Sequence, residues 1–281
     1  MTTLNNYEFQ VADQLHDPLN TKWTLAQLDG YINEARRQLV MDTGCLRSLQ
    51  QGFVTAGVEQ YTFGQVTGGV IVAGGSGYTG PSVAFSGGGG SGVAATLTQS
   101  SGAVNTIAFT SSGSGYSSVP SNIVSDVGPG VGAQLSFGIL NVNTYDVLDV
   151  HLIWGTERYS LRWLPFRQFS AWYRPFTAAA FQRQPVCWAV YGDTSIFLGP
   201  TPDQSYAVEF DTIILPTDLP DYVTIDPIPP VAQDPIKFYA AYLAKNNVQS
   251  YGEAENFLSQ YRRRLLEVTS VYTGRIVDPY E

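Results

Sequence analysis

Apolar residues recur at helical spacing near the N-terminal end of the chain. One apolar-patterned segment covers residues 6–16, and a longer one starts after Thr24. Thr24 and Gln27 fit a capping box, in which two side chains bond the free backbone N–H groups at the start of a helix. We therefore expect a short helix that Pro18 closes and a second helix that ends near Gly44. The polar face expected for the second helix contains Asp29, Asn33, Arg36 and Arg37.

The stretch 139–222 has a different period. Valine, leucine and isoleucine alternate with polar residues at 141–154, and a similar run follows at 186–198. A period of two is typical of strands that bury one face. Gly192 and Asp193 interrupt the second run with turn residues, so we expect an antiparallel hairpin there.

Helical spacing returns in the C-terminal part. Asp234 followed by Pro235 is a typical helix start, because the first carries a capping carboxylate and the second fits the first turn. Ser250 and Glu253 form another capping box ahead of the last helix. The expected fold class is α+β, with a helical body from the N-terminal and C-terminal segments and a β-rich region at 139–222.

Residues 66–137 differ in composition from both flanks. They contain one charged residue, Asp126, and 17 of the 28 glycines. The tetrapeptide Gly-Ser-Gly-Tyr occurs once in each half, between short runs that alternate Val, Ile and Phe with polar residues. A flexible Gly/Ser linker would not show this alternation. We expect an inserted all-β module at 66–137 in an adaptor-like body made of 1–65 and 138–281.

Charge and composition exclude several classes. The chain has 281 residues and a net charge of −9, which argues against tight nucleic-acid binding, because duplex affinity comes mainly from phosphate neutralisation. No apolar run is long enough to cross a bilayer, so we expect no membrane partner. Cys45 and Cys187 are expected to be reduced, buried thiols. His16 and His151 have no ligand partner nearby in sequence, so we expect no metal and no cofactor.

Four acidic residues are candidates for the carboxylate pair of a glycoside hydrolase. They lie among prolines, where aspartate is a common turn residue, so we expect solvated loop positions and no catalytic residue. These residues are Asp211, Asp218, Asp221 and Asp226. Nucleophile-elbow, phosphate-loop and metalloprotease motifs are also missing from the sequence, and we expect no enzyme activity.

Arginine and aromatic residues are concentrated between residues 157 and 188. This composition is typical of interface hot spots. It would also suit stacking on single-stranded nucleic acid or a core in which Arg stems cover rings. We favour a subunit or partner interface, whose candidate residues are Arg158, Arg162, Trp163, Phe166, Arg167, Trp172, Tyr173 and Arg174. A separate basic run on the last expected helix consists of Arg262, Arg263 and Arg264.

Several flanking segments, taken in order, resemble the head-to-tail adaptor, or connector, proteins of tailed phages. The resemblance rests on residues 23–28, 31–37, 61–63 and 185–200 and on the terminal helical pair. It covers about three quarters of the chain. The insert at 66–137 is the departure, since most such adaptors lack it.

The resemblance implies a structural protein of the virion, located at the head-tail junction after assembly in the host cytoplasm. Its partners would be the portal protein, a tail nozzle or tube protein, and other copies of itself in a ring of about twelve. Double-stranded DNA would pass through the ring without specific binding. The C-terminal tail would dock into the portal through Tyr272, Arg275, Ile276, Val277 and Tyr280, and the basic run at 262–264 would face an acidic portal patch.

Two other functions remain open. In a carbohydrate-binding or receptor-binding tail protein, the insert would be the active part, with Tyr78 and Tyr116 as candidates for stacking on sugars. Tyrosines that end β-turns are more often packing residues, and we favour that interpretation. A cell-wall glycoside hydrolase is the weaker alternative and would use the acidic residues named above.

Overall fold

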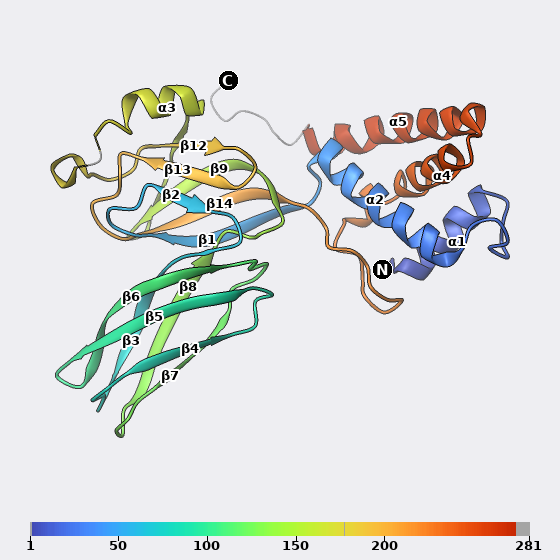
Figure 1. The fold of residues 1–281 in the computed structure, drawn as a ribbon. Helices are drawn as coiled ribbons and strands as arrows, with labels where there is room; N and C mark the ends of the chain where they lie inside the picture. Colours follow the sequence, from blue (N-terminus) through green and yellow to red (C-terminus); the bar gives the residue numbers. More distant parts are fainter. Residues whose placement is uncertain (1, 177, 274–281) are drawn as a thin grey trace. The chain divides into compact units, whose positions relative to one another are not determined.

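The computed structural model describes residues 2–176 and 178–273, and it confirms a mixed α+β fold (Figure 1). The chain forms two compact units. Met1–Arg47 and Ile213–Glu281 make up the helical unit, and Ser48–Thr212 makes up the β unit. The four long helices therefore lie in one unit and most strand residues in the other, so each unit builds its core mainly from one kind of element.

Four helices build the helical unit: α1 (Leu4–Gln14), α2 (Leu25–Thr43), α4 (Ile236–Asn247) and α5 (Tyr251–Thr273). A short 3-10 turn at Pro230–Ala232 precedes α4. The core of this unit consists of apolar side chains at helical spacing, among them the fully buried Leu28, Ile32 and Leu39 of α2.

The helix ends agree with the sequence at α2 and differ at α4. The Thr24 hydroxyl accepts a hydrogen bond from the backbone N–H of Gln27 at 3.4 Å, and Gly44 ends the helix in the left-handed region at φ 60°. At α4 the N-cap is Pro235, without a side-chain cap. The Asp234 carboxylate instead accepts a hydrogen bond from the Lys237 ammonium at 2.6 Å.

A buried charge network contradicts two expectations. Arg36 was placed on a polar face and Asp226 in a solvated loop, but both side chains are completely buried and form an ion pair, with Arg36 Nη2 2.8 Å from Asp226 Oδ1. The Tyr7 hydroxyl donates to Asp226 Oδ2 at 2.6 Å, and Arg36 also donates to Asn33 and to the Thr217 carbonyl. The network fixes the segment before α4 to α1 and α2.

The β unit contains two four-stranded sheets that pack face to face. One sheet has the order β1 (Arg47–Val54), β14 (Tyr206–Ile214), β9 (Thr144–Trp154) and β10 (Glu157–Ser160). The other has the order β11 (Arg162–Trp163), β12 (Cys187–Tyr191), β13 (Ser195–Gly199) and β2 (Gln60–Thr62). Side chains from both sheets form one core, including Val150, Leu152, Trp188, Leu198 and Phe210.

The predicted hairpin at Gly192 and Asp193 is confirmed, with Tyr191 opposite Ser195 in an antiparallel pair. The expectation of strands over 139–222 is wrong in two places, the first being residues 215–222, which follow the end of β14 and form no strand. In the second, a seven-residue helix, α3 (Phe166–Trp172), and a 3-10 turn at Ala179–Phe181 lie between β11 and β12. Figure 1 shows α3 covering the sheet that contains β12 and β13.

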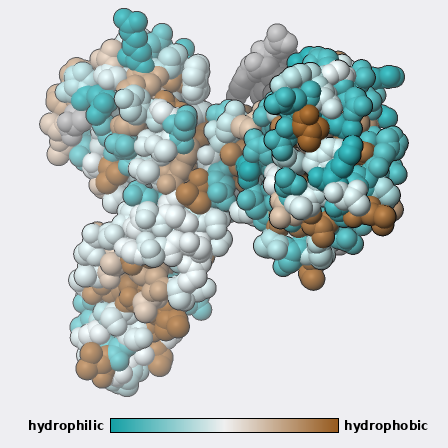
Figure 2. Space-filling view, turned by 45° about the vertical axis from the view of Figure 1, so that its right-hand side comes forward, coloured by the Kyte–Doolittle hydropathy of each residue, from teal (hydrophilic) through white to brown (hydrophobic). Residues whose placement is uncertain are grey.

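Residues 66–137 form strands that are joined by turns. β3 (Val66–Ser76) pairs with β8 (Val131–Ile139), and a four-stranded sheet has the order β6 (Ala103–Ser114), β5 (Ser91–Ser100), β4 (Ser82–Ser86) and β7 (Ser121–Ser125). Their core includes Leu97, Val104, Leu135 and Phe137. Figure 2 shows that the surface of these strands is mostly white to brown, in keeping with the near absence of charge, whereas the helical unit is largely teal.

The two Gly-Ser-Gly-Tyr elements place their tyrosines in the core. Tyr78 and Tyr116 are both buried, and the Tyr78 hydroxyl accepts a hydrogen bond from the backbone N–H of Ala133 at 3.1 Å. Packing is thus their role, and neither ring is free to stack on a sugar. Asp126 accepts backbone hydrogen bonds from Gly80, Gly128 and other residues of two neighbouring turns. Desolvation raises the pKa of Asp126, but these backbone donors outweigh it and lower the pKa.

Candidate assembly surface

Helix α3 is attached to its sheet by a small aromatic core. Pro165 precedes the helix, where its missing N–H costs no hydrogen bond. Phe169 is fully buried beside Phe197, with ring centroids 6.0 Å apart. A Cβ at Gly199 would come within 2.6 Å of the Phe169 ring, so only glycine permits this close approach. The helix is therefore held firmly enough to present its other side chains outward.

Six of the eight predicted interface residues are exposed, and four of these lie on β11 and α3. Trp163 and Trp172 are 56% and 57% exposed, and Arg162 and Arg167 are exposed as well. Among the residues that the structure describes, neither arginine has an acidic partner. We refer to Arg162, Trp163, Arg167 and Trp172 as the α3 surface.

The other four predicted interface residues have contacts within the β unit. Phe166 and Tyr173 are partly buried: the Phe166 ring is 4.4 Å from that of Tyr191, and the Tyr173 ring is 5.6 Å from that of Phe169. Arg174 donates to Glu59 at 3.3 Å and lies over the Phe197 ring at 5.4 Å. These three residues fit the core interpretation, in which arginine stems cover aromatic rings.

Arg158 belongs to a different surface. It lies on β10, in the sheet opposite the one that carries α3, and its Nη1 is 3.0 Å from the Glu209 carboxylate. Sequence proximity placed Arg158 beside Arg162, but the chain crosses from one sheet to the other between them. The ion pairs of Arg158 with Glu209 and of Arg174 with Glu59 both depend on how the strands are arranged, which residue composition does not reveal.

Several other large apolar side chains of the same region, some of them in the arginine and aromatic stretch at 157–188, are also exposed. These are Trp154, Tyr159, Phe176, Phe181, Val186 and Tyr191. Trp154, Tyr159 and Val186 line a shallow pocket of about 500 Å³ together with Pro185. A monomer exposes so many large apolar side chains in one region less often than an assembling subunit does.

The structure describes the basic run at 262–264 but not the C-terminal tail from residue 274 on. All three arginines of the run are exposed on α5, and Arg264 bonds Glu267 at 3.0 Å. Tyr272 lies within α5, but its side chain is outside the described residues. The other docking candidates, Arg275, Ile276, Val277 and Tyr280, lie outside the described residues as well.

Each of the four acidic candidates has a partner of its own. Asp226 pairs with Arg36, Asp218 pairs with Arg37, and Asp221 accepts from the backbone N–H of Thr224. Hydrogen bonds from the backbone and side chain of Thr224, and from the Val223 N–H, lower the pKa of Asp221. Asp211 lies on β14 and also has a partner. A glycosidase acid requires a raised pKa, so this geometry does not favour hydrolysis.

Cys45 and Cys187 are buried free thiols, as expected, and burial raises the pKa of Cys187 to about 11. Over residues 2–176 and 178–273, no three His, Cys, Asp or Glu side chains gather as a metal site would require. None of the helices in those ranges is both long and apolar enough to span a membrane.

An α+β chain with a rigid arginine and tryptophan surface is typical of a structural subunit that assembles with other proteins. The family model described as SU10 adaptor protein matches residues 93–277, from β5 to beyond α5. The chain belongs to this family of phage adaptor proteins, and it is therefore a structural component of the virion. No curated protein matches the chain. The resemblance drawn from the sequence is thus confirmed at the level of the family.

Proposed function

We propose that the protein is a head-to-tail adaptor that forms a ring, joins the portal protein to the tail nozzle or tube, and lines the channel through which DNA passes. Membership of the phage adaptor family is the observation that carries this proposal. The acidic net charge of −9 supports it, since an acidic channel wall repels DNA and lets the polyanion slide.

Ring closure requires each copy to contact two neighbours through different surfaces. We assign one of these contacts to the α3 surface. On association, two exposed tryptophan side chains would be removed from water. Two arginines without acidic partners in their own chain would pair with carboxylates of the neighbouring copy. Arg158 and Arg174 have partners within the chain and contribute less to this contact.

The tail at 272–281 and the basic run at 262–264 are assigned to portal docking. Arg262 and Arg263 are exposed on α5 and have no acidic partner among the described residues, which supports a portal-facing role. Residues 66–137 are assigned to an inserted module within the adaptor body, because their own apolar core supports separate folding. The adaptor body then consists of 1–65 and 138–281.

The test is electron microscopy of the purified full-length chain mixed with the portal protein of the same phage. We expect rings of the chain stacked on portal rings. Removal of residues 272–281 should abolish this stacking while the circular dichroism spectrum stays that of the parent. Particles that carry the chain as a fibre or as a single copy away from the portal vertex would refute the proposal.

A further inference from the structure

Exposed residues of β9 carry apolar and acidic groups that complement the α3 surface. Val147, Val150 and Leu152 point into the core of the sandwich. Between and before them, Tyr145 is 47% exposed and Leu148 is 37% exposed. The four residues that form this β9 strip are Tyr145, Asp146, Leu148 and Asp149. The strip therefore combines two apolar side chains with two carboxylates.

The carboxylates of the β9 strip have no arginine or lysine partner among the described residues. Asp146 Oδ1 accepts only the backbone N–H of Val147, at 2.8 Å. Asp149 is 38% exposed, accepts from the Val150 N–H and the Ser160 hydroxyl, and has His151 Nε2 3.4 Å away. Oxygens of both groups thus remain available to a guanidinium, which binds carboxylates through two parallel hydrogen bonds.

Charge in the β unit is strongly segregated. Its five arginines all lie between residues 158 and 183, and this unit has no lysine. Its nine acidic residues all lie outside that range. Two α3 surfaces would repel each other, as would two β9 strips, so a two-fold contact of either kind is unfavourable. A contact between unlike surfaces is head-to-tail, which is the kind that closes into rings.

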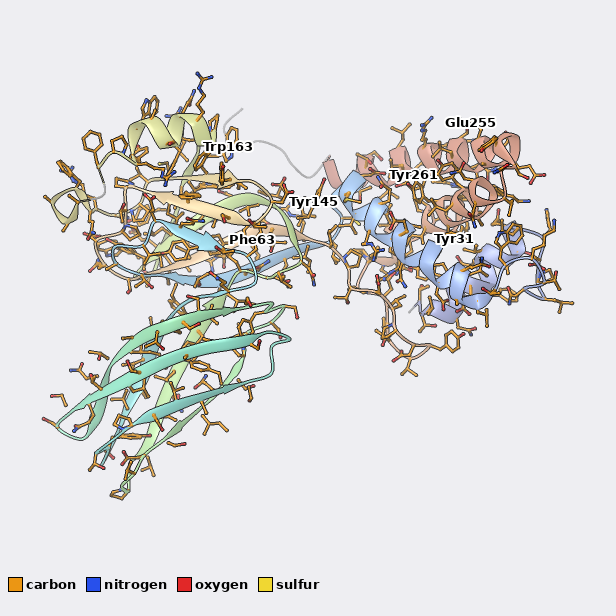
Figure 3. All side chains as sticks on the ribbon, viewed as in Figure 1. Tyr31, Phe63, Tyr145, Trp163, Glu255 and Tyr261 are labelled. Carbon is orange, nitrogen blue, oxygen red and sulfur yellow. The ribbon has the colours of Figure 1, made fainter. Side chains whose placement is uncertain are left out.

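The two surfaces lie on different sheets of the sandwich. β11, which carries Trp163, belongs to one sheet, and β9, which carries Tyr145, belongs to the other. Trp163 and Tyr145 are both labelled in Figure 3, on β11 and β9 respectively. One copy can therefore use both surfaces at the same time.

We infer that the α3 surface of one copy docks on the β9 strip of the next copy in the ring. Arg162 and Arg167 pair with Asp146 and Asp149, while the tryptophans pack on Tyr145 and Leu148. This inference rests on the proposed ring and names the two faces that build it.

Two charge-reversal variants of the full chain test the inference in a phage that lacks the gene and receives it in trans. One variant carries R162E and R167E, and the other carries D146R and D149R. We expect each variant alone to lower the yield of infectious particles roughly a hundredfold, because like charges then meet at every contact. Co-expression of both variants should restore the yield, because contacts in an alternating ring join opposite charges.

A third variant carries all four substitutions in one chain and should also restore the yield, whatever the number of subunits. Glu255→Arg, at an exposed position of α5 (Figure 3), is the matched control and should leave the yield unchanged. The melting temperature of each purified variant should equal that of the parent, which separates lost contact from lost folding.

The outcomes distinguish this inference from the proposed function. Full yield from either double variant alone, or no recovery in both the mixture and the fourfold variant, would overturn the pairing of these two faces. If particles that lack the chain altogether still join heads to tails, the adaptor function itself is wrong.

Discussion

The two units of the molecule use arginine in opposite ways. In the helical unit, Arg36 is completely buried, and its guanidinium bonds Asp226, Asn33 and the carbonyl of Thr217. In the β unit, Arg162 and Arg167 are exposed and have no acidic partner among the described residues. One arginine thus holds the chain together, and the other two are available to another molecule.

This difference shows that residue type does not decide between folding and assembly. A buried guanidinium must have all its partners inside the chain, because an unpaired buried charge is very costly. An exposed guanidinium is hydrated, so the folded chain loses little stability when its acidic partner lies in another subunit. Substitutions in the first set should therefore change stability, and substitutions in the second should change assembly alone.

The largest effect is expected for Asp226→Ala. The change leaves Arg36 buried without its counter-ion, so we expect the free energy of unfolding to fall by about 3–5 kcal/mol. Urea unfolding followed by far-ultraviolet circular dichroism measures the loss in the helices. Asp218→Ala is the matched control, since its ion pair with Arg37 is exposed and worth at most about 1 kcal/mol. Equal midpoints for both variants would contradict the assigned role of the buried pair.

A second buried carboxylate of the helical unit has an acid, not an arginine, beside it. Glu8 of α1 is buried, and its Oε1 and the Oδ1 of Asp29 on α2 are both buried without a hydrogen-bond partner among the described residues. Burial, followed by the hydrogen bond and charge of Asp29, raises the pKa of Glu8 from 4.5 to about 7, against a smaller lowering by Tyr222. A proton on Glu8 turns this carboxyl group into a hydrogen-bond donor.

The raised pKa of Glu8 predicts a pH-dependent stability. The folded state holds this proton more tightly, so the contribution is complete below pH 4.5 and is lost as the pH rises to about 7. The free energy of unfolding of the parent should fall by up to about 3 kcal/mol over this window relative to Glu8→Gln. Unfolding in urea at several pH values measures the difference. Glu255→Gln, at an exposed site, should follow the parent, and parallel curves for parent and Glu8→Gln would exclude the raised pKa of Glu8.

The smallest effect on stability is expected on the α3 surface. Trp163→Ala and Trp172→Ala should each change the free energy of unfolding by no more than about 0.5 kcal/mol, because both side chains are largely exposed. Phe169→Ala, only a few positions away but buried, should cost about 3–5 kcal/mol. Thermal unfolding gives these values, and sedimentation with the portal protein shows whether the tryptophan variants still assemble. A large loss of stability in either tryptophan variant would show that this residue contributes to folding and not to assembly alone.

Local signals in the sequence predicted the local structure. The Thr24 capping box, the Gly44 helix end and the turn at Gly192 are all determined by residues within a few positions of one another. The buried state of Tyr78 and Tyr116 also followed from their repeated place after a glycine turn.

Partners distant in sequence were not predictable in this way. Arg36 and Asp226 are 190 positions apart, and each looks like a solvated residue in its own segment. Helix α3 was missed because seven residues rich in aromatics show no clear helical period. The division of the arginine cluster into Arg158, Arg174 and the α3 surface depends on which sheet each strand joins. Composition located the region, and only the tertiary structure separated its members.

The pairing of Val66 with Ile139 has a consequence for how such chains diversify. The segment between them begins and ends at adjacent points of the fold. Its length therefore has little effect on the strands that flank it. Under the proposed division into adaptor body and inserted module, a larger or smaller module could replace residues 66–137 and leave the strand pairing at its base unchanged.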